Sequence, residues 1–179
     1  MSDALDAVRR HRSWSRVTGE APTDAQLEVL VAAAARVADH SSLRPWRLIT
    51  LRGDDRERLG RAIDEASGED GSSSKPLRAP LLIAIVASHR PSEKVPHWEQ
   101  AAVAAGIAHV LSLLLDDAGW GVMWRTGHHT RSAAVARLHG LRDGEELLGW
   151  LYVGGKDEAS RPSPRPPVDV AEHLGPLPR

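Results

Sequence analysis

The run Leu81–Ala87, directly after Pro80, restricts the fold of this chain more than any other feature of its sequence. It reads Leu-Leu-Ile-Ala-Ile-Val-Ala and contains no polar residue. A short apolar run without polar alternation is typical of a strand that is buried on both faces of its sheet. The sequence therefore predicts a central strand here, with other elements packed on either side of it.

Helical and strand patterns alternate along the rest of the chain. Thr23, with Gln26 three residues later, predicts the N-cap of the clearest amphipathic helix. Helices are expected over residues 3–10, 23–37, 55–66, 98–117 and 131–138, strands over 46–51 and 147–153, and a short strand or turn over 119–124. Because these elements surround one core, the class is mixed α and β.

The C-terminal stretch 160–179 differs in composition from the rest. It holds six of the 12 prolines and shows no apolar periodicity, so it does not suit a core element. We therefore expect a single domain over residues 1–159, which the length also favours. A Pro-rich arm over 160–179 is expected to follow, either disordered or extended on another surface.

Composition excludes several kinds of site. The chain has no cysteine, so a thiol mechanism, a disulfide and a Cys-ligated metal are excluded. Its net charge of −1 argues against a nucleic-acid partner.

The most apolar stretch, 101–115, is interrupted by His109 and Ser112 and falls short of the roughly 20 residues that a bilayer needs. With no apolar leader at its N-terminus, the protein is expected in the cytoplasm and not in a membrane.

One candidate binding segment ends the first helix. His11, Arg12 and Ser13 follow two further arginines, and guanidinium groups beside a hydroxyl suit a phosphate monoester. The alternative is a solvated basic helix end that complements the dipole of its own helix.

Two further segments also combine cations with other binding groups. Arg36 and His40 would share a face if the second helix continued, although cations at a helix C-terminus before a Pro stop are the simpler interpretation. Trp124, Arg125 and Thr126 offer a stacking surface, a cation and a hydroxyl between glycines that admit a flat ligand. A turn into a core strand is the alternative there.

Catalytic side chains and metal ligands are not expected. His128 and His129 are adjacent, so their side chains are expected to diverge, and no carboxylate accompanies them at ligand spacing. The chain also lacks the serine motif of a nucleophile elbow.

Taken in order, these segments resemble the FMN-dependent nitroreductase family, and in particular its short bacterial NAD(P)H nitroreductases. The resemblance spans about residues 5–153. It rests on His11-Arg12-Ser13, on the segment 36–46 that closes in Pro-Trp, on Lys-Val-Pro-His-Trp-Glu-Gln at 94–100 before an Ala-rich helix, and on Trp-Arg-Thr-Gly at 124–127. Three tryptophans fall in these segments, whereas Trp14, Trp120 and Trp150 are expected to be packing residues.

The resemblance implies an α+β fold in which helices flank a central, mostly antiparallel sheet, and a homodimer with an extended C-terminal arm. FMN would bind at the subunit interface. The residues implied to contact it are His11, Arg12, Ser13, Trp124, Arg125, Thr126 and, in the arm, Arg165, with Arg36 and His40 approaching from the other subunit.

The implied activity is hydride transfer from NAD(P)H, through flavin N5, to a nitro, quinone or similar small-molecule acceptor. It follows a ping-pong cycle, and the flavin and not a side chain carries the chemistry. Residues 114–119 are expected to meet the nicotinamide nucleotide. A flavin enzyme of the same fold with other chemistry, such as dehalogenation, and a non-catalytic flavin- or nucleotide-binding dimer remain alternatives.

Overall fold

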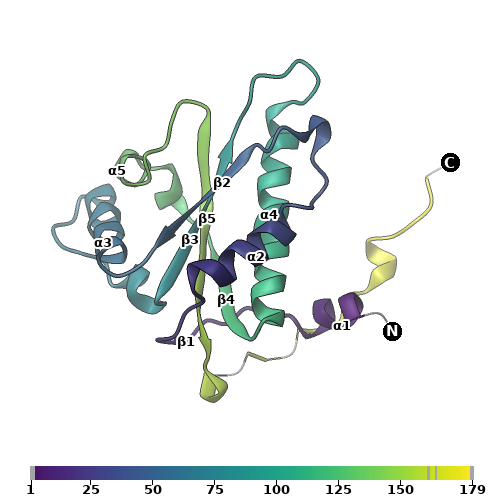
Figure 1. The fold of residues 1–179 in the computed structure, drawn as a ribbon, viewed down its shortest axis with the longest axis horizontal. Helices are drawn as coiled ribbons and strands as arrows, with labels where there is room; N and C mark the ends of the chain where they lie inside the picture. Colours follow the sequence, from purple (N-terminus) through teal and green to yellow (C-terminus); the bar gives the residue numbers. More distant parts are fainter. Residues whose placement is uncertain (1–2, 161, 164, 178–179) are drawn as a thin grey trace.

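A five-stranded antiparallel sheet forms the centre of the computed structural model, which describes residues 3–160, 162–163 and 165–177 (Figure 1). Residues 1–2, 161, 164 and 178–179, which belong to the predicted domain and arm, lie outside the described residues. The strands are β1 (Val17–Thr18), β2 (Trp46–Leu51), β3 (Leu81–Ser88), β4 (Trp120–Arg125) and β5 (Glu145–Lys156). β3 is buried at every position, which confirms the central strand.

Each strand pair in the described part of the chain is antiparallel, which confirms the predicted sheet. β2 and β5 flank β3, and β4 pairs with β5. Gly155 of β5 is paired with both Thr18 and Trp120, so β1 and β4 lie on opposite edges of β5. The two-residue strand β1 was not predicted, because a strand this short has no detectable pattern in a polar stretch.

The helices are α1 (Asp3–Arg10), α2 (Asp24–Ala34), α3 (Asp54–Ser67), α4 (His97–Asp117) and α5 (Ala133–Leu138). α3 and α5 cover one face of the sheet, and α2 and α4 cover the other (Figure 1). Alternate β3 residues serve the two faces, with Leu82 and Val86 in the core cluster of α3 and α5 and Ile83 in that of α2 and α4. This arrangement explains why the β3 sequence contains no polar position.

The start of α2 matches its prediction and its end does not. Thr23 and Gln26 form the reciprocal capping box, with Gln26 N donating to Thr23 Oγ1 at 3.3 Å and Thr23 N donating to Gln26 Oε1 at 2.8 Å. The helix ends at Ala34 and not near Val37. Arg36 N and Val37 N donate to carbonyls three residues back, so the last turn tightens and the helix stops.

α4 has 21 residues and is longer than the apolar stretch on which the sequence argument rested. By length and composition alone it could cross a membrane. In the structure it packs along the sheet, with Ile107, Leu111 and Leu115 fully buried, and it also buries the polar side chains of Gln100, Ser112 and Asp116. α4 is therefore a core helix in this fold.

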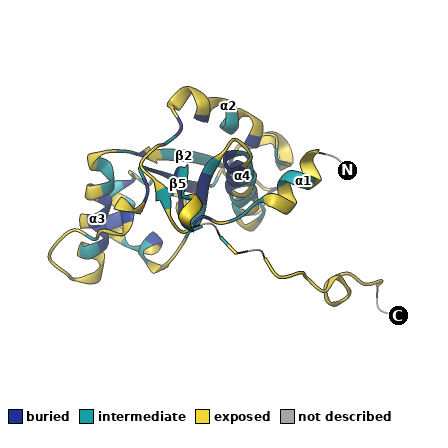
Figure 2. Cartoon of the chain, turned by 90° about the horizontal axis from the view of Figure 1, so that it is seen from below, coloured by how far each residue is buried: buried dark blue, intermediate teal, exposed yellow. Residues whose placement is uncertain are grey.

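The C-terminal arm runs away from the sheet and helices (Figure 1), and Figure 2 shows it exposed, as is much of α1. One 3-10 turn, Val170–Glu172, interrupts its extended course. Several large apolar side chains of the arm are solvent-exposed: Val168, Val170, Leu174 and Leu177. The arm thus presents apolar surface without a cover from its own chain in the described residues.

Candidate functional site

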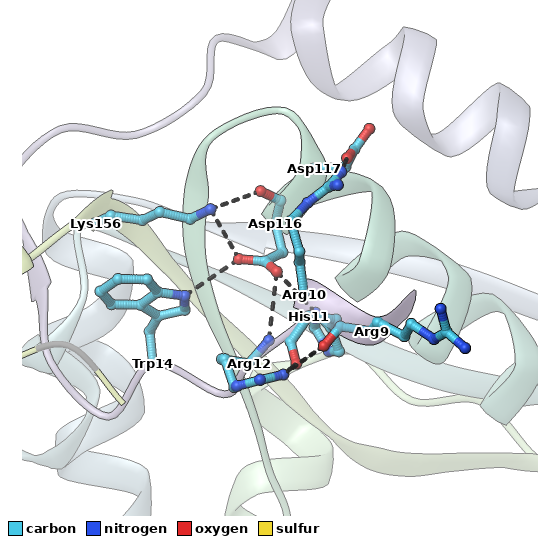
Figure 3. A network of polar contacts seen from close by, with 8 residues as sticks. All are labelled: Arg9, Arg10, His11, Arg12, Trp14, Asp116, Asp117 and Lys156. Atoms are coloured by element: carbon cyan, nitrogen blue, oxygen red, sulfur yellow. Dashed lines mark hydrogen bonds and ion pairs between the residues drawn. The ribbon is translucent and has the colours of Figure 1, made fainter. Parts of the chain in front are cut away.

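The first predicted binding segment is fixed to the end of α4 by a buried carboxylate, that of Asp116 (Figure 3). Asp116 Oδ2 lies 3.2 Å from His11 Nδ1 and 3.4 Å from Arg12 N. Its Oδ1 accepts from Trp14 Nε1 at 3.2 Å and lies 3.0 Å from Lys156 Nζ. We call these five residues, His11, Arg12, Trp14, Asp116 and Lys156, the Asp116 cluster.

Arg12 contributes its backbone to this cluster, while its guanidinium turns to α1. Its Nη1 donates to Arg9 O and to His11 O, each at 2.8 Å. This contact caps carbonyls at the C-terminal end of α1, where a cation complements the helix dipole. Ser13, the next residue, is exposed.

A cavity of about 680 Å³ lies beside the cluster. Its lining comes from α1, the end of α4, the end of β5 and the first residues of the arm: Ala7, Arg10, Arg12, Trp14, Asp116, Asp117, Lys156, Glu158, Pro162 and Ser163. Basic and acidic side chains are balanced in this lining. The predicted ligand Arg165, exposed in the arm, follows Ser163 closely in the chain.

A second cavity, of about 570 Å³, is more strongly basic. It is lined by Ser15, Arg16, Val17, Arg78, Arg125 and Asp157, so three arginines face one carboxylate. Arg125 Cζ lies 5.2 Å from the centre of the Tyr152 ring, and its Nη2 donates to Ser15 O at 3.4 Å. Among the described residues, Arg125 Nε is buried without a hydrogen-bond partner.

The sequence predicted Arg125 as a cofactor-binding residue and gave no signal for Arg16 and Arg78. These two are single cations in an arginine-rich chain, and only the fold shows that they line one cavity with Arg125. Burial raises the pKa of the Tyr152 hydroxyl, and the charges of Arg125 and Arg78 act in the opposite direction. Both guanidinium groups therefore act on this buried phenol.

Trp124 and Thr126 lie on either side of Arg125, at the end of β4. The Trp124 indole meets His109 edge-on, with ring centres 5.1 Å apart, and within the described residues its buried Nε1 has no hydrogen-bond partner. Thr126 is exposed. The segment therefore offers an unpaired indole N–H, an unpaired guanidinium N–H and an accessible threonine.

Gly149 of β5 makes room for this segment. A Cβ at position 149 would lie 2.5 Å from Arg125 O and 2.8 Å from Trp124 Nε1. Its φ of 136° also lies in a region that other residues rarely adopt. Only glycine therefore fits here, and no sequence signal linked Gly149 to Trp124.

Arg36 and His40 lie in the loop between α2 and β2, both exposed. Because α2 ends at Ala34, the helical spacing expected to align them does not occur. His40 Nδ1 lies 2.8 Å from Glu99 Oε1, in the first turn of α4. Three residues of this loop that are not glycine have positive φ, namely Ser41, Ser42 and Arg44 at 62°, 51° and 48°. Such strained backbone is common at binding sites.

Two of the predicted segments thus lie at opposite ends of α4, namely the end of α1 and the loop between α2 and β2 (Figure 1). The third, Trp124–Thr126, lies at the end of β4. His40 is held near Glu99, and His11 and Arg12 are held near Asp116. At about 1.5 Å per residue, Glu99 and Asp116 are about 25 Å apart along the helix axis.

His128 and His129 do not diverge as expected, since their ring centres are 3.9 Å apart. Burial, and next the charges of His128 and Lys75, lower the pKa of His129. Among the described residues, no group of three or more His, Cys, Asp or Glu side chains is placed to hold a metal ion.

Comparison with known protein families shows where this fold belongs. The profile of the Nitroreductase family matches residues 8–155. The chain belongs to the nitroreductase family. The match covers all five strands except the last residue of β5, and it includes every candidate binding residue except Arg165.

A relative with more than 30% identity agrees with this membership. Escherichia coli YdjA, named as a candidate NAD(P)H nitroreductase, is 34% identical over 160 residues, which cover 85% of this chain and 87% of YdjA. A Haemophilus influenzae protein with the same kind of name is 28% identical over 169 residues, covering 89% and 92% of the two chains.

Two solved structures match nearly the whole fold. A nitroreductase-like family protein from Bacillus cereus has a TM-score of 0.83 at 19% identity, with 99% of this chain and 97% of that chain covered. The FMN and NADPH-dependent nitroreductase NfnB from Sphigopyxis sp. strain HMH has a TM-score of 0.75 at 17% identity, with 99% and 100% covered.

Proposed function

We propose that this nitroreductase-family protein is an FMN-dependent NAD(P)H oxidoreductase that passes hydride to a nitro, quinone or similar small-molecule acceptor. The family match over residues 8–155 carries the proposal. It is supported by the names of its relatives, which include an FMN and NADPH-dependent enzyme of the same fold. The cycle is ping-pong, so the nicotinamide nucleotide leaves before the acceptor enters.

The residues present fit FMN, which combines a phosphate dianion with a flat ring. Three arginines line one cavity with a single carboxylate, which favours an anionic ligand. Arg125, which lines this cavity, has a buried Nε without a partner among the described residues. A bound ligand that accepts hydrogen bonds would satisfy this donor.

This proposal keeps the site residues that the family resemblance implied, with Arg36 and His40 approaching the flavin from the other subunit. His11, Arg12 and Ser13 hold the phosphate and ribityl chain, and Trp124, Arg125 and Thr126 line the ring. Arg165 of the arm adds a phosphate contact. Arg16 and Arg78 join Arg125 as the cations of the second cavity.

FMN, when bound, supplies a ring that accepts hydride at N5 from NAD(P)H and returns it to the acceptor. The contribution of the chain is electrostatic and positional. Arg125, with Arg16 and Arg78, stabilises the negative charge that develops in the site, because these cations are already in place. Residues 114–119 contact the nicotinamide nucleotide. No side chain has to act as nucleophile or general base.

We further propose a homodimer with FMN at the subunit interface. Because His40 and Arg12 are held at opposite ends of α4, the two groups of ligands meet more readily across two chains than within one. The exposed apolar side chains of α1, Leu5 and Val8, and those of the arm suit burial against a partner subunit. Residues 1–159 then form the FMN-binding domain and 160–179 the arm, in a cytoplasmic protein.

A flavin titration tests the proposal. The purified protein is expected to bind FMN, and anaerobic NADH or NADPH is expected to bleach the flavin absorbance, which a nitroaromatic or a quinone restores. Arg125→Ala should weaken FMN binding by about tenfold to a hundredfold, because a charge-assisted contact is lost. Arg61→Ala, exposed on α3, is the matched control and should leave binding unchanged.

A failure of FMN binding, of reduction by NAD(P)H or of reoxidation by the acceptor would each contradict a different step of the proposal. Absence of FMN binding overturns it. Flavin that binds but is not bleached by either nucleotide favours a non-catalytic flavin-binding dimer. Bleached flavin that neither acceptor reoxidises favours an enzyme of the same fold with other chemistry.

A further inference from the structure

We propose that Asp116 is a positioning residue for the flavin phosphate, which acts by fixing the orientation of the segment His11–Ser13. The inference rests on the proposed FMN site. Asp116 lies in the last turn of α4, whereas the segment it fixes is near the start of the chain (Figure 3). Nothing in the local sequence of either segment connects the two.

The contacts of Asp116 hold the segment on both sides of the proposed phosphate ligands. His11 Nδ1 and Arg12 N face Oδ2, at 3.2 and 3.4 Å, and Trp14 Nε1 donates to Oδ1 at 3.2 Å. Trp14 itself is buried and donates its backbone N–H to Val122 O at 2.9 Å. The backbone from residue 11 to residue 14 is therefore fixed, and with it the direction in which Ser13 and Arg12 project.

A carboxylate is suited to this role because both of its oxygens accept. An asparagine would keep one acceptor and turn an NH₂ group toward either the His11 and Arg12 side or the Trp14 and Lys156 side. The residues on that side would then face an NH₂ donor in place of a carboxylate oxygen that accepts their hydrogen bonds. Substitution by the nearly isosteric amide should consequently release the segment without leaving a cavity.

Asp116 does not pair with the guanidinium of Arg12, so the positive charge of Arg12 remains available to a phosphate. It contacts the backbone N–H of Arg12, and the guanidinium donates to the neutral carbonyls of Arg9 and His11. Lys156, 3.0 Å from Oδ1, provides the counter-charge for the carboxylate and also donates to Asp116 O at 2.8 Å. The cluster therefore needs no cation from the proposed phosphate site.

The position of Asp116 is otherwise unfavourable. A buried acidic side chain at a helix C-terminus opposes the helix dipole and loses its hydration. It would also repel a phosphate in the adjacent cavity, which Asp116 itself lines. A direct electrostatic role and a positioning role thus predict opposite changes in FMN affinity when the charge of Asp116 is removed. Binding should tighten if the role is electrostatic and weaken if Asp116 positions the segment.

The test compares Asp116→Asn with Asp55→Asn. Asp55 is the matched control, because it is a surface carboxylate of α3, outside the candidate site, and pairs with Arg58 at 2.7 Å. Dissociation constants are measured for FMN and for riboflavin, which lacks the phosphate, by quenching of flavin fluorescence. We expect Asp116→Asn to weaken FMN binding at least about tenfold, with riboflavin binding changed less than twofold. Asp55→Asn should leave the binding of both flavins unchanged.

Unchanged or tighter FMN binding by Asp116→Asn overturns the inference. Equal weakening for FMN and riboflavin also overturns it, because a general structural role moves both ligands together. If Asp116→Asn fails to fold by circular dichroism, Asp116→Asn with Lys156→Gln removes both charges and is expected to show the same selective loss. A wild-type protein that binds neither flavin would instead refute the proposed function, and this inference with it.

Discussion

The carboxylate of Glu145 accepts two hydrogen bonds from the guanidinium of Arg47, from Nε at 2.8 Å and from Nη2 at 2.7 Å. Arg47 belongs to β2 and Glu145 begins β5, while Ser88 at the end of β3 donates to the same carboxylate at 3.0 Å. Arg47 Nη2 also donates to Gly140 O, after α5, at 2.9 Å. The pair thus ties three strands to the α5 side of the core.

Arg47→Ala should destabilise the protein by about 3–5 kcal/mol, because it leaves the carboxylate of Glu145, whose side chain is 3% exposed, without its charged partner. Arg131→Ala is the control, since Arg131 pairs with Glu146 at 2.9 Å on the surface and should cost less than about 1 kcal/mol. Urea unfolding measures both. Equal losses would show that the Arg47 pair contributes no more than a surface pair.

Acid should weaken the fold through the same carboxylate. The hydrogen bonds from Arg47 lower the pKa of Glu145 from 4.5 to about 2. The stabilisation is therefore fully present above about pH 4.5 and is lost as the pH falls toward 2, with a total of about 3 kcal/mol. Unfolding free energies measured across this range should fall less steeply in Glu145→Gln than in the wild type. Parallel curves would refute the assignment.

His139 should produce a separate pH dependence nearer neutrality. Burial lowers its pKa, and Trp150 Nε1 donates to its Nε2 at 3.0 Å while Nδ1 lies 2.8 Å from Val135 O, so the folded state holds a neutral ring. Since the unfolded state binds the proton more readily, stability should decline as the pH falls below about 6.5. The melting temperature of wild type should drop between about pH 7.5 and 5.5, and that of His139→Gln should drop less. The same drop in both would exclude His139 as its source.

Gly149→Ala should damage the Trp124–Thr126 segment. The added Cβ would meet Arg125 O and the Trp124 indole at distances shorter than real contacts, and its backbone would be strained. We expect a loss of about 2 kcal/mol or more in unfolding free energy and weaker FMN binding. Gly19→Ala, with nothing within 4 Å of the added Cβ, should stay within about 0.5 kcal/mol of wild type. Retained stability and affinity in Gly149→Ala would contradict the proposed packing.

Local patterns predicted those parts of the fold that local physics decides. The continuous apolar run at β3 predicted burial on both faces, and the Thr23–Gln26 spacing predicted a capping box, because both depend on a few neighbouring residues. The predicted end of α2 was wrong because its alanine-rich sequence contains no residue that signals the end of a helix. The loop that follows is instead held by a distant contact, between His40 and Glu99.

The candidate site was predictable in its segments but not in its assembly. Trp14 and Trp150 were expected to be packing residues, and both are buried, yet each also donates its indole N–H, to Asp116 and to His139 respectively. The contact between His11 and Asp116 spans 105 residues, and neither residue carries a signal for the other. Long-range contacts of this kind depend on the completed fold and not on spacing in the sequence.

A hybrid dimer tests most directly the claim that each FMN is held by two chains. Arg12→Ala and His40→Ala are made in differently tagged chains, and the mixed dimer is purified through both tags. If Arg12 of one subunit and His40 of the other hold the same flavin, one site of the hybrid carries both changes and the second site carries neither. We expect one FMN to bind each hybrid dimer with wild-type affinity, although both parent homodimers bind weakly. A hybrid in which both sites bind as weakly as the parents would contradict it.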